Sequence, residues 1–291
     1  MIVLLLSILS SSTIYIVFKM FGKFKINTLN ALIVNYFTAF ILGISMQENT
    51  NVDALLETTS KDWFLGSVFL GVMFIIVFTL MVMTTQKGGM SVVSVASKMS
   101  VAIPVVFVIF YYDESLGILK IIGILLALFS VYLVSIRKRD GLKIDMKYFI
   151  FPLLVFLGSG IIESSLKYLE NTYVSDADVP LFSANTFLFA CVSGLLIYVF
   201  KAFKKENRYR WKDVLGGFAL GIPNYFSIYF FIKALRIESL NDSSIFIINN
   251  VSIVLLSTVL GILFFKEKLI PKNWLGILLA IASIVLITYL N

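Results

Sequence analysis

Long apolar runs without charged residues recur along the whole chain, separated by short polar segments. Each run has about 20 residues, the length that an α-helix needs to cross the hydrocarbon core of a bilayer. The pattern therefore predicts an all-α membrane protein with ten transmembrane helices. Their expected bounds are 2–21, 28–46, 63–85, 91–112, 117–136, 148–168, 181–203, 213–235, 243–265 and 272–290. The first run is apolar from its second residue and lacks a preceding basic region, so we expect a retained helix rather than a cleaved signal peptide.

The second half of the chain repeats the first. Residues 114–133 and 267–286 align without gaps, and 9 of the 20 positions are identical. Leucine matches mean little between apolar helices, but the glutamate, glycine and serine matches in register are informative. Further identical pairs in the earlier helices are Ser11/Ser159, Lys19/Lys167, Asn35/Asn185, Phe37/Phe187, Leu65/Leu215, Gly66/Gly216, Leu70/Leu220 and Gly71/Gly221. An internal repeat of about 150 residues follows from these matches.

Five spans per copy fix how the two copies would be oriented. A unit with an odd number of spans ends on the side opposite to its start, so the second copy enters the membrane upside down. Two inverted five-helix repeats are the plan of many secondary transporters. We expect a first repeat at 1–137, a basic connecting loop at 138–147 and a second repeat at 148–291.

Composition excludes several classes of protein. With 59% apolar and 14% charged residues, the chain has no room for a soluble domain of ordinary size. The single cysteine, Cys191, cannot form an intramolecular disulfide. The chain contains no histidine, which excludes imidazole-based proton relays, His-ligated metals and His-based catalytic triads. We therefore expect no metal and no cofactor.

The charged residues lie mainly in alternate loops. The loops after the odd-numbered helices carry 18 Lys and Arg, whereas the loops after the even-numbered helices carry 5, with Lys98 as the remaining one of the 24. Short basic loops stay in the cytoplasm, so the bias predicts that both termini lie outside. The net charge of +7 then reflects orientation and contact with lipid headgroups, and we expect no nucleic-acid partner.

Three features carry a resemblance to a known family. They are the paired Glu-x-Leu turns with a glycine nine residues after each glutamate (Glu114/Gly123 and Glu267/Gly276), the lysines near the ends of helices 1 and 6, and Pro104 in helix 4. The chain resembles the drug/metabolite transporter (DMT) superfamily over nearly its whole length, specifically its ten-helix EamA-type members. The resemblance implies a protein that moves small metabolites, amino acids or drugs across the cytoplasmic membrane, often outward.

The chain departs from that family pattern in two ways. Members of this kind commonly keep both termini in the cytoplasm, whereas the charge bias here predicts the reverse. Small multidrug-resistance relatives carry a membrane glutamate eight residues before the helix-1 lysine. Ser11 stands at that place here, and Ser159 at its repeat, so their proton-coupling mechanism cannot simply be transferred.

Lys98 is the strongest candidate for substrate binding, because a lysine inside a span is costly unless it faces protein or water. It could pair with a carboxylate or phosphate of a substrate. The alternatives are an ion pair with Glu163 and a side chain that reaches for the membrane surface. Asn249 and Asn250 lie in the corresponding part of helix 9, so the repeat would bring these amides and Lys98 towards one site. Amides both donate and accept hydrogen bonds, which suits a zwitterionic or polyhydroxylated ligand.

Glu163 is the only acid well inside a predicted span, and it lies among small residues of helix 6. It could exchange a proton during a transport cycle, which makes it the candidate for coupling to an ion gradient. The alternative is a structural partner for Lys98 or Lys167.

Further polar residues within spans could line a cavity or form interhelical hydrogen bonds, and the sequence favours neither reading. They are Asn35, Asn185, Asn224, Tyr225 and Tyr229, with Tyr15 as a weaker candidate.

Two pairs of repeated residues favour structural roles. Glu114 and Glu267 precede helices 5 and 10, where a carboxylate satisfies free N–H groups and opposes the helix dipole. The small-xxx-small pairs Gly123/Ala127 and Gly276/Ala280 allow close helix approach, within the molecule rather than at a dimer interface.

Together these features predict a secondary transporter of small metabolites, amino acids first and with export favoured, that works by alternating access in the cytoplasmic membrane. Its partners would be the small-molecule substrate, membrane lipid and a proton or another coupling ion, and the protein would be a monomer or a homodimer. Transport of drugs, sugar phosphates or lipid carriers by the same fold stays open, as does a non-transporting membrane scaffold. An intramembrane enzyme is not expected, because no convergent set of acid, base and nucleophile is visible.

Overall fold

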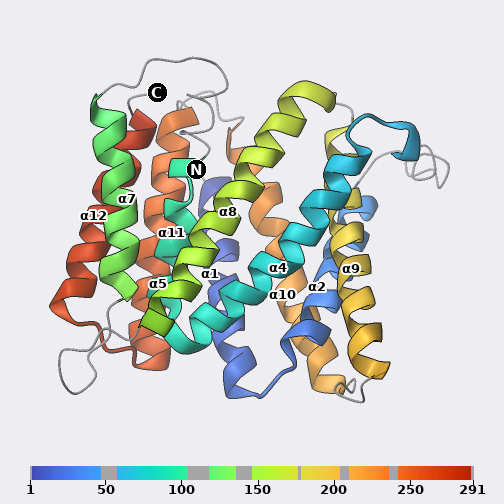
Figure 1. The fold of residues 1–291 in the computed structure, drawn as a ribbon, viewed down its shortest axis with the longest axis horizontal. Helices are drawn as coiled ribbons and strands as arrows, with labels where there is room; N and C mark the ends of the chain where they lie inside the picture. The colour runs from blue at the N-terminus through green and yellow to red at the C-terminus, as the bar shows by residue number, and fades with distance from the viewer. Residues whose placement is uncertain are drawn as a thin grey trace.

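The computed structural model describes residues 2–46, 58–103, 118–135, 146–175, 178–203, 210–235 and 242–289. In these ranges the chain forms ten α-helices and one 3-10 turn, which Figure 1 shows as a bundle of helices. The α-helices are α1 (Ile2–Lys23), α2 (Thr28–Ser45), α4 (Phe64–Gly88), α5 (Met90–Met99), α7 (Ile118–Ser135), α8 (Met146–Tyr173), α9 (Val179–Phe203), α10 (Trp211–Leu235), α11 (Asp242–Phe265) and α12 (Pro271–Tyr289), and the 3-10 turn η1 is Thr58–Ser60.

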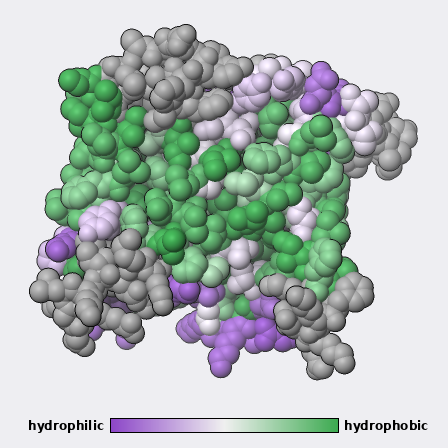
Figure 2. Space-filling model, viewed as in Figure 1, coloured by the Kyte–Doolittle hydropathy of each residue, from purple (hydrophilic) through white to green (hydrophobic). Residues whose placement is uncertain are grey.

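Nine of the ten predicted spans coincide with one of these helices, and α5 forms the first part of the remaining one, which confirms the all-α membrane fold. Seven of the described helices are long and apolar enough to cross a membrane, and α7 and α12 contain the shorter apolar segments Ile121–Val134 and Pro271–Leu286. Large apolar side chains such as Leu65, Phe200 and Leu278 are exposed on the outside of the bundle. Figure 2 shows a hydrophobic band across one face of the molecule, with hydrophilic residues at its lower edge and at its upper right, as expected for a surface in contact with lipid.

Helix 4 differs from its prediction as one continuous span at 91–112. Helix α5 ends at Met99, and a turn at Ser100 and Val101 interrupts it before helical backbone resumes at Ala102. At this turn the Ile103 N–H donates to the carbonyl oxygen of Ser100, an i,i+3 bond that is tighter than an α-helical one. The sequence accounts for the break, because proline, which stands at position 104, has no N–H to offer the carbonyl four residues earlier in a helix. Residues 104–117 lie outside the described ranges.

The two halves of the chain exchange equivalent contacts. Helix α1 packs against α10 and α11, and its counterpart α8 packs against α4 and α5; the pairs α2/α9, α5/α11 and α7/α12 pack against each other. Two matched glycines lie at close contacts, Gly71 between α4 and α9 and Gly221 between α10 and α2. A Cβ atom on Gly71 would come within 2.6 Å of Phe189 in α9, and one on Gly221 within 2.6 Å of Thr38 in α2. The internal repeat therefore reappears in the packing.

Helices α7 and α12 pack through the predicted small residues. The Ser283 hydroxyl donates to the Gly123 carbonyl at 2.7 Å, and Gly276 lies against Leu133 and Val134. These contacts confirm that the small-xxx-small pairs serve packing within the molecule.

Two acids of the second half cap helices of the first half. The Asn27 N–H, which precedes α2, donates to Asp213 at 2.8 Å, and Asp213 also pairs with Arg210. The Met90 N–H, at the start of α5, donates to Glu267. The prediction that Glu267 caps the helix that follows it is therefore wrong, because the chain turns its carboxylate towards a helix of the other half. Glu114 lies outside the described residues.

Candidate functional site

Lys98 lies at the end of α5, next to the break, and is partly buried. Among the described residues it forms no ion pair within 4.0 Å. It does interact electrostatically with Glu163. The predicted alternative of a direct Lys98–Glu163 ion pair is therefore not formed, and the two charges lie in the same region without touching.

Glu163 extends from α8 towards α5. Its Oε1 lies 3.1 Å from the hydroxyl of Ser100, which also lies within hydrogen-bonding distance of the Ser97 carbonyl. Glu163 interacts electrostatically with Tyr15 of α1 as well as with Lys98 of α5. It is nevertheless exposed. Since its neighbours come from α1 and α5, the exposed carboxylate faces other helices of the bundle.

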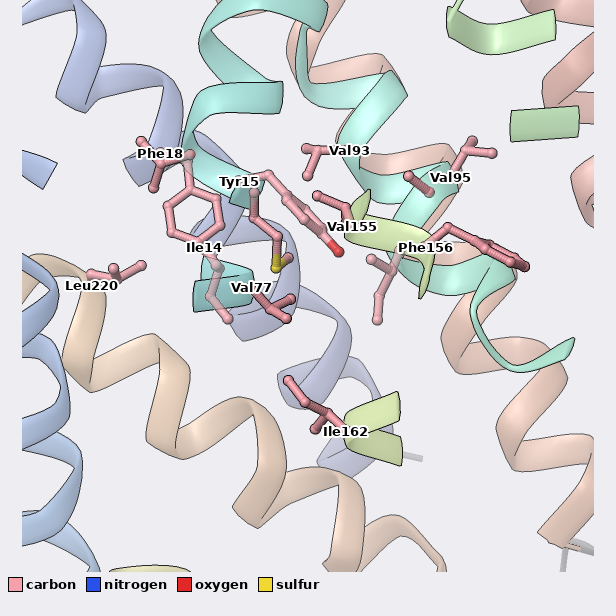
Figure 3. Close-up of a cluster of buried hydrophobic side chains, with 14 of the residues drawn as sticks. Ile14, Tyr15, Phe18, Val77, Val93, Val95, Val155, Phe156, Ile162 and Leu220 are labelled. Atoms are coloured by element: carbon pink, nitrogen blue, oxygen red, sulfur yellow. The ribbon is translucent and has the colours of Figure 1, made fainter. Parts of the chain in front are cut away.

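Tyr15 completes this group, although the sequence made it only a weak candidate. It is 3% exposed and its phenol interacts with the Ser97 hydroxyl. Figure 3 shows it among buried apolar side chains of α1, α5 and α8, including Val93 and Val155. We name Tyr15, Ser97, Lys98, Ser100 and Glu163 the central polar cluster.

The repeat contains the signal that would have found Tyr15. Tyr15 and Glu163 are 148 residues apart, as are Lys19 and Lys167, so they occupy equivalent positions in the two halves. Asn249 and Asn250 lie in the part of α11 that corresponds to the region of Lys98 in α5.

Asn249 and Asn250 are 4% and 8% exposed in α11. The Ser7 hydroxyl of α1 lies 3.3 Å from Oδ1 of Asn249 and 3.1 Å from the carbonyl oxygen of Ser227 in α10. Asn249 therefore belongs to a polar junction of α1, α10 and α11. Its role, and that of Asn250, in substrate binding stays a prediction.

The amides of α2, α9 and α10 are buried between helices. Nδ2 of Asn224 donates to Oδ1 of Asn35 at 3.2 Å. Of the two roles that the sequence allowed, cavity lining and interhelical hydrogen bonding, this contact is the second. The amide nitrogens of Asn35 and Asn185 have no hydrogen-bond partner in the described part of the chain. Contact with a substrate stays a prediction for all three residues.

Tyr225 and Tyr229 form an aromatic row along α10. Their rings stack with centroids 5.9 Å apart and planes 21° apart, and the Lys233 ammonium lies 4.5 Å from the centroid of the Tyr229 ring. Both tyrosines are partly exposed. The structure joins them to each other, but it shows no contact between them and the central polar cluster.

The central polar cluster offers a cation, an anion and hydroxyl groups within one small region. An ammonium and a carboxylate that do not satisfy each other can each bind the opposite charge of a dipolar ligand. Within the described ranges, no group of three or more His, Cys, Asp or Glu side chains could hold a metal ion.

Comparison with known proteins gives three results. The model of the EamA-like transporter family matches residues 1–136 and 150–289. A protein of Haemophilus influenzae (strain ATCC 51907 / DSM 11121 / KW20 / Rd), described only as an uncharacterized protein, is 26% identical over 294 residues, covering 99% of this chain and 98% of that protein. A solved crystal structure covers 99% of this chain and 96% of its own, with a TM-score of 0.63 and 16% identity, a likeness that shows a shared fold alone.

Proposed function

Because the chain belongs to the EamA-like transporter family, we propose that it is a secondary transporter that exports small metabolites, amino acids first, across the cytoplasmic membrane. Membership itself supports a multi-pass membrane transporter of the DMT type. The substrate, the direction and the alternating-access mechanism are our proposal.

One observation carries the choice of substrate: Lys98 and Glu163 lie in the same region without forming an ion pair. A partly buried lysine without an ionic partner is costly, so a ligand that supplies a carboxylate to Lys98 would be favoured, and the exposed Glu163 could meet the opposite charge of the same ligand. An amino acid carries a carboxylate for Lys98 and an ammonium for Glu163. A sugar phosphate or another anionic carrier would use only Lys98, which makes it the second choice.

Two inverted halves would supply the movement. The equivalent packing of α1 on α10 and of α8 on α4 is the arrangement that two such units need to rock against each other. Asn249 and Asn250 would contribute from the second half, as Lys98 does from the first. The roles of Asn35, Asn185, Asn224, Tyr225 and Tyr229 in lining the path are part of the same proposal, as are the repeat boundaries at 1–137 and 148–291.

Glu163 would couple transport to a proton gradient. A carboxylate that meets substrate and water in alternation can bind a proton in one half of the cycle and release it in the other. Orientation follows from the loop charges, which place the face with Lys19 and Arg210 in the cytoplasm and both termini outside. A membrane scaffold, the rival from another class, would not need an internal cation and acid.

The test is flux of labelled amino acids in proteoliposomes. Lys98→Met keeps the length of the side chain and removes its charge, and we expect flux per folded protein to fall about tenfold or more, the effect of losing one charge-assisted contact. Lys268→Met, an exposed lysine in the loop before α12, is the matched control and should keep the parental flux. Unchanged flux in Lys98→Met would remove this lysine from the substrate path.

A further inference from the structure

Glu267 joins the two halves of the molecule at the face where α1 and α11 end. Its Oε1 lies 2.9 Å from Nζ of Lys19 in α1, and both of its carboxylate oxygens accept from the Met90 N–H, at 2.9 and 3.1 Å. The two charged side chains are only 10% and 22% exposed. The Glu267 carboxylate of the second half therefore contacts both Lys19 and the N-terminus of α5 in the first half.

Two glycines make room for this carboxylate. A Cβ on Gly89, which precedes α5, would lie 2.8 Å from the Glu267 carboxylate, and one on Gly261 of α11 would lie 2.7 Å from it. Gly89 also has a φ of 101°, which side chains other than glycine rarely adopt. The socket thus takes one glycine from each half, and it fits a carboxylate closely.

Burial is complete in the parts of α1 and α5 that lie beside this contact. Phe18, Phe21 and Met90 are 0% exposed, and every residue of α5 from 90 to 96 is buried. Lys98 is partly exposed and Glu163 is exposed. Met90 and Lys98 are eight residues apart on one helix, or roughly 12 Å. A run of buried residues in α5 therefore lies between the Glu267 contact and Lys98.

We propose that the contact of Glu267 with Lys19 and the Met90 N–H is a latch, which holds this face closed in the state described and must break for the transporter to open towards it. The inference rests on the proposed transport function. To that function it adds the contact that must break when the two halves of the molecule separate.

The chemistry of the latch suits a contact that opens and closes. Both side chains are largely withdrawn from water while the contact is closed, so each needs the other as its partner in that state. When the halves separate, water would reach the carboxylate, the ammonium and the free N–H, so none of them would be left buried without a partner. The Asp213 contact differs, because Asp213 is 0% exposed and lies where α2 and α10 pack through glycines.

The test uses a single reporter cysteine in the full-length protein in vesicles. Cys191 is the only native cysteine, so Cys191→Ala removes the background. Ser94, buried at 0% between the latch and Lys98, becomes the reporter as Ser94→Cys. The rate of labelling by a membrane-impermeant maleimide is measured from each face separately.

We expect Glu267→Gln and Lys19→Met each to raise labelling from the latch face about tenfold, as loss of a charge-assisted bond would shift the equilibrium towards the open state. Lys19→Arg keeps the ion pair and should label like the parent. Lys268→Gln, a neighbour of Glu267 that is exposed, should also be silent.

Parental labelling rates in folded Glu267→Gln and Lys19→Met would overturn the latch. The same vesicles report amino-acid flux, which separates the two proposals. If the Glu267→Gln and Lys19→Met substitutions do not change the labelling rate while amino-acid flux is intact, the latch is rejected and the proposed transport function stands. Responsive labelling without flux of any amino acid rejects the proposed substrate and leaves the latch standing.

Discussion

Equivalent positions in the two halves keep the same residue where they pack and differ where they form the central polar cluster. Gly71 and Gly221 match and make equivalent close contacts with the helices of the other half. Tyr15 corresponds to Glu163, and the part of α11 that corresponds to the region of Lys98 carries Asn249 and Asn250. The packing constraint is the same in both halves, because α4 packs against α9 as its counterpart α10 packs against α2. The cluster lies between the halves, so it can take a cation from one and an acid from the other.

Substitutions at the packing glycines should have the largest effect. Gly71→Val and Gly221→Val each add a Cβ within 2.6 Å of a neighbouring helix, so both should destabilise the protein by at least about 1–3 kcal/mol and lower the yield of folded protein. Melting temperature in detergent measures the effect. Because the two environments are equivalent, the two losses should be similar, and a loss in only one would show that the halves pack differently.

The cluster can instead be made symmetric. Lys98→Asn places at position 98 an amide like those in the corresponding part of α11 and should lower amino-acid flux by about tenfold or more, since the only cation of the cluster is lost. Asn250→Ala should have a smaller effect. The comparison would be contradicted if Lys98→Asn transported like the parent while Asn250→Ala did not.

Removing the acid tests the coupling. Glu163→Gln keeps the shape and the contact with Ser100 but cannot release a proton, so we expect flux that no longer responds to an imposed pH gradient. Flux driven by the substrate gradient alone should also fall, by about tenfold, because the contact with the substrate's ammonium loses its charge. The measurement is uptake at a fixed amino-acid gradient, with and without a pH step. A variant that still follows the pH step would exclude Glu163 as the coupling group.

The smallest effect is expected at the aromatic counterpart of Glu163. Tyr15→Phe removes one hydroxyl that interacts with Ser97 and leaves the buried ring in place. If the hydroxyl meets the substrate, its loss predicts a change of about threefold to tenfold in the half-saturating substrate concentration, with little change in folding. No change would place the hydroxyl outside the site.

Sequence periodicity predicted where the helices lie, because an apolar run of membrane length has few alternatives. It did not predict the break after Met99, although Pro104 supplies its cause, since prolines are tolerated in many transmembrane helices. It also assigned Glu267 to the wrong helix. Capping rules describe neighbours along the chain, whereas this carboxylate reaches a helix start of the other half.

The site was only partly visible in the sequence. Lys98 and Glu163 stood out because charges are rare in spans, and the structure brings them into one region. Tyr15 did not stand out, because tyrosine is common in membrane helices and only its repeat position marks it. The bond between Asn35 and Asn224 joins helices whose relative rotation no single helix pattern specifies.

The most direct test of the central claim compares amino-acid flux in Lys98→Glu, Glu163→Lys and the double variant that exchanges the two charges. If a cation and an acid from the two halves bind one dipolar substrate, each single reversal should abolish flux and the exchange should restore a measurable part of it. Parental flux in either single reversal would contradict the account.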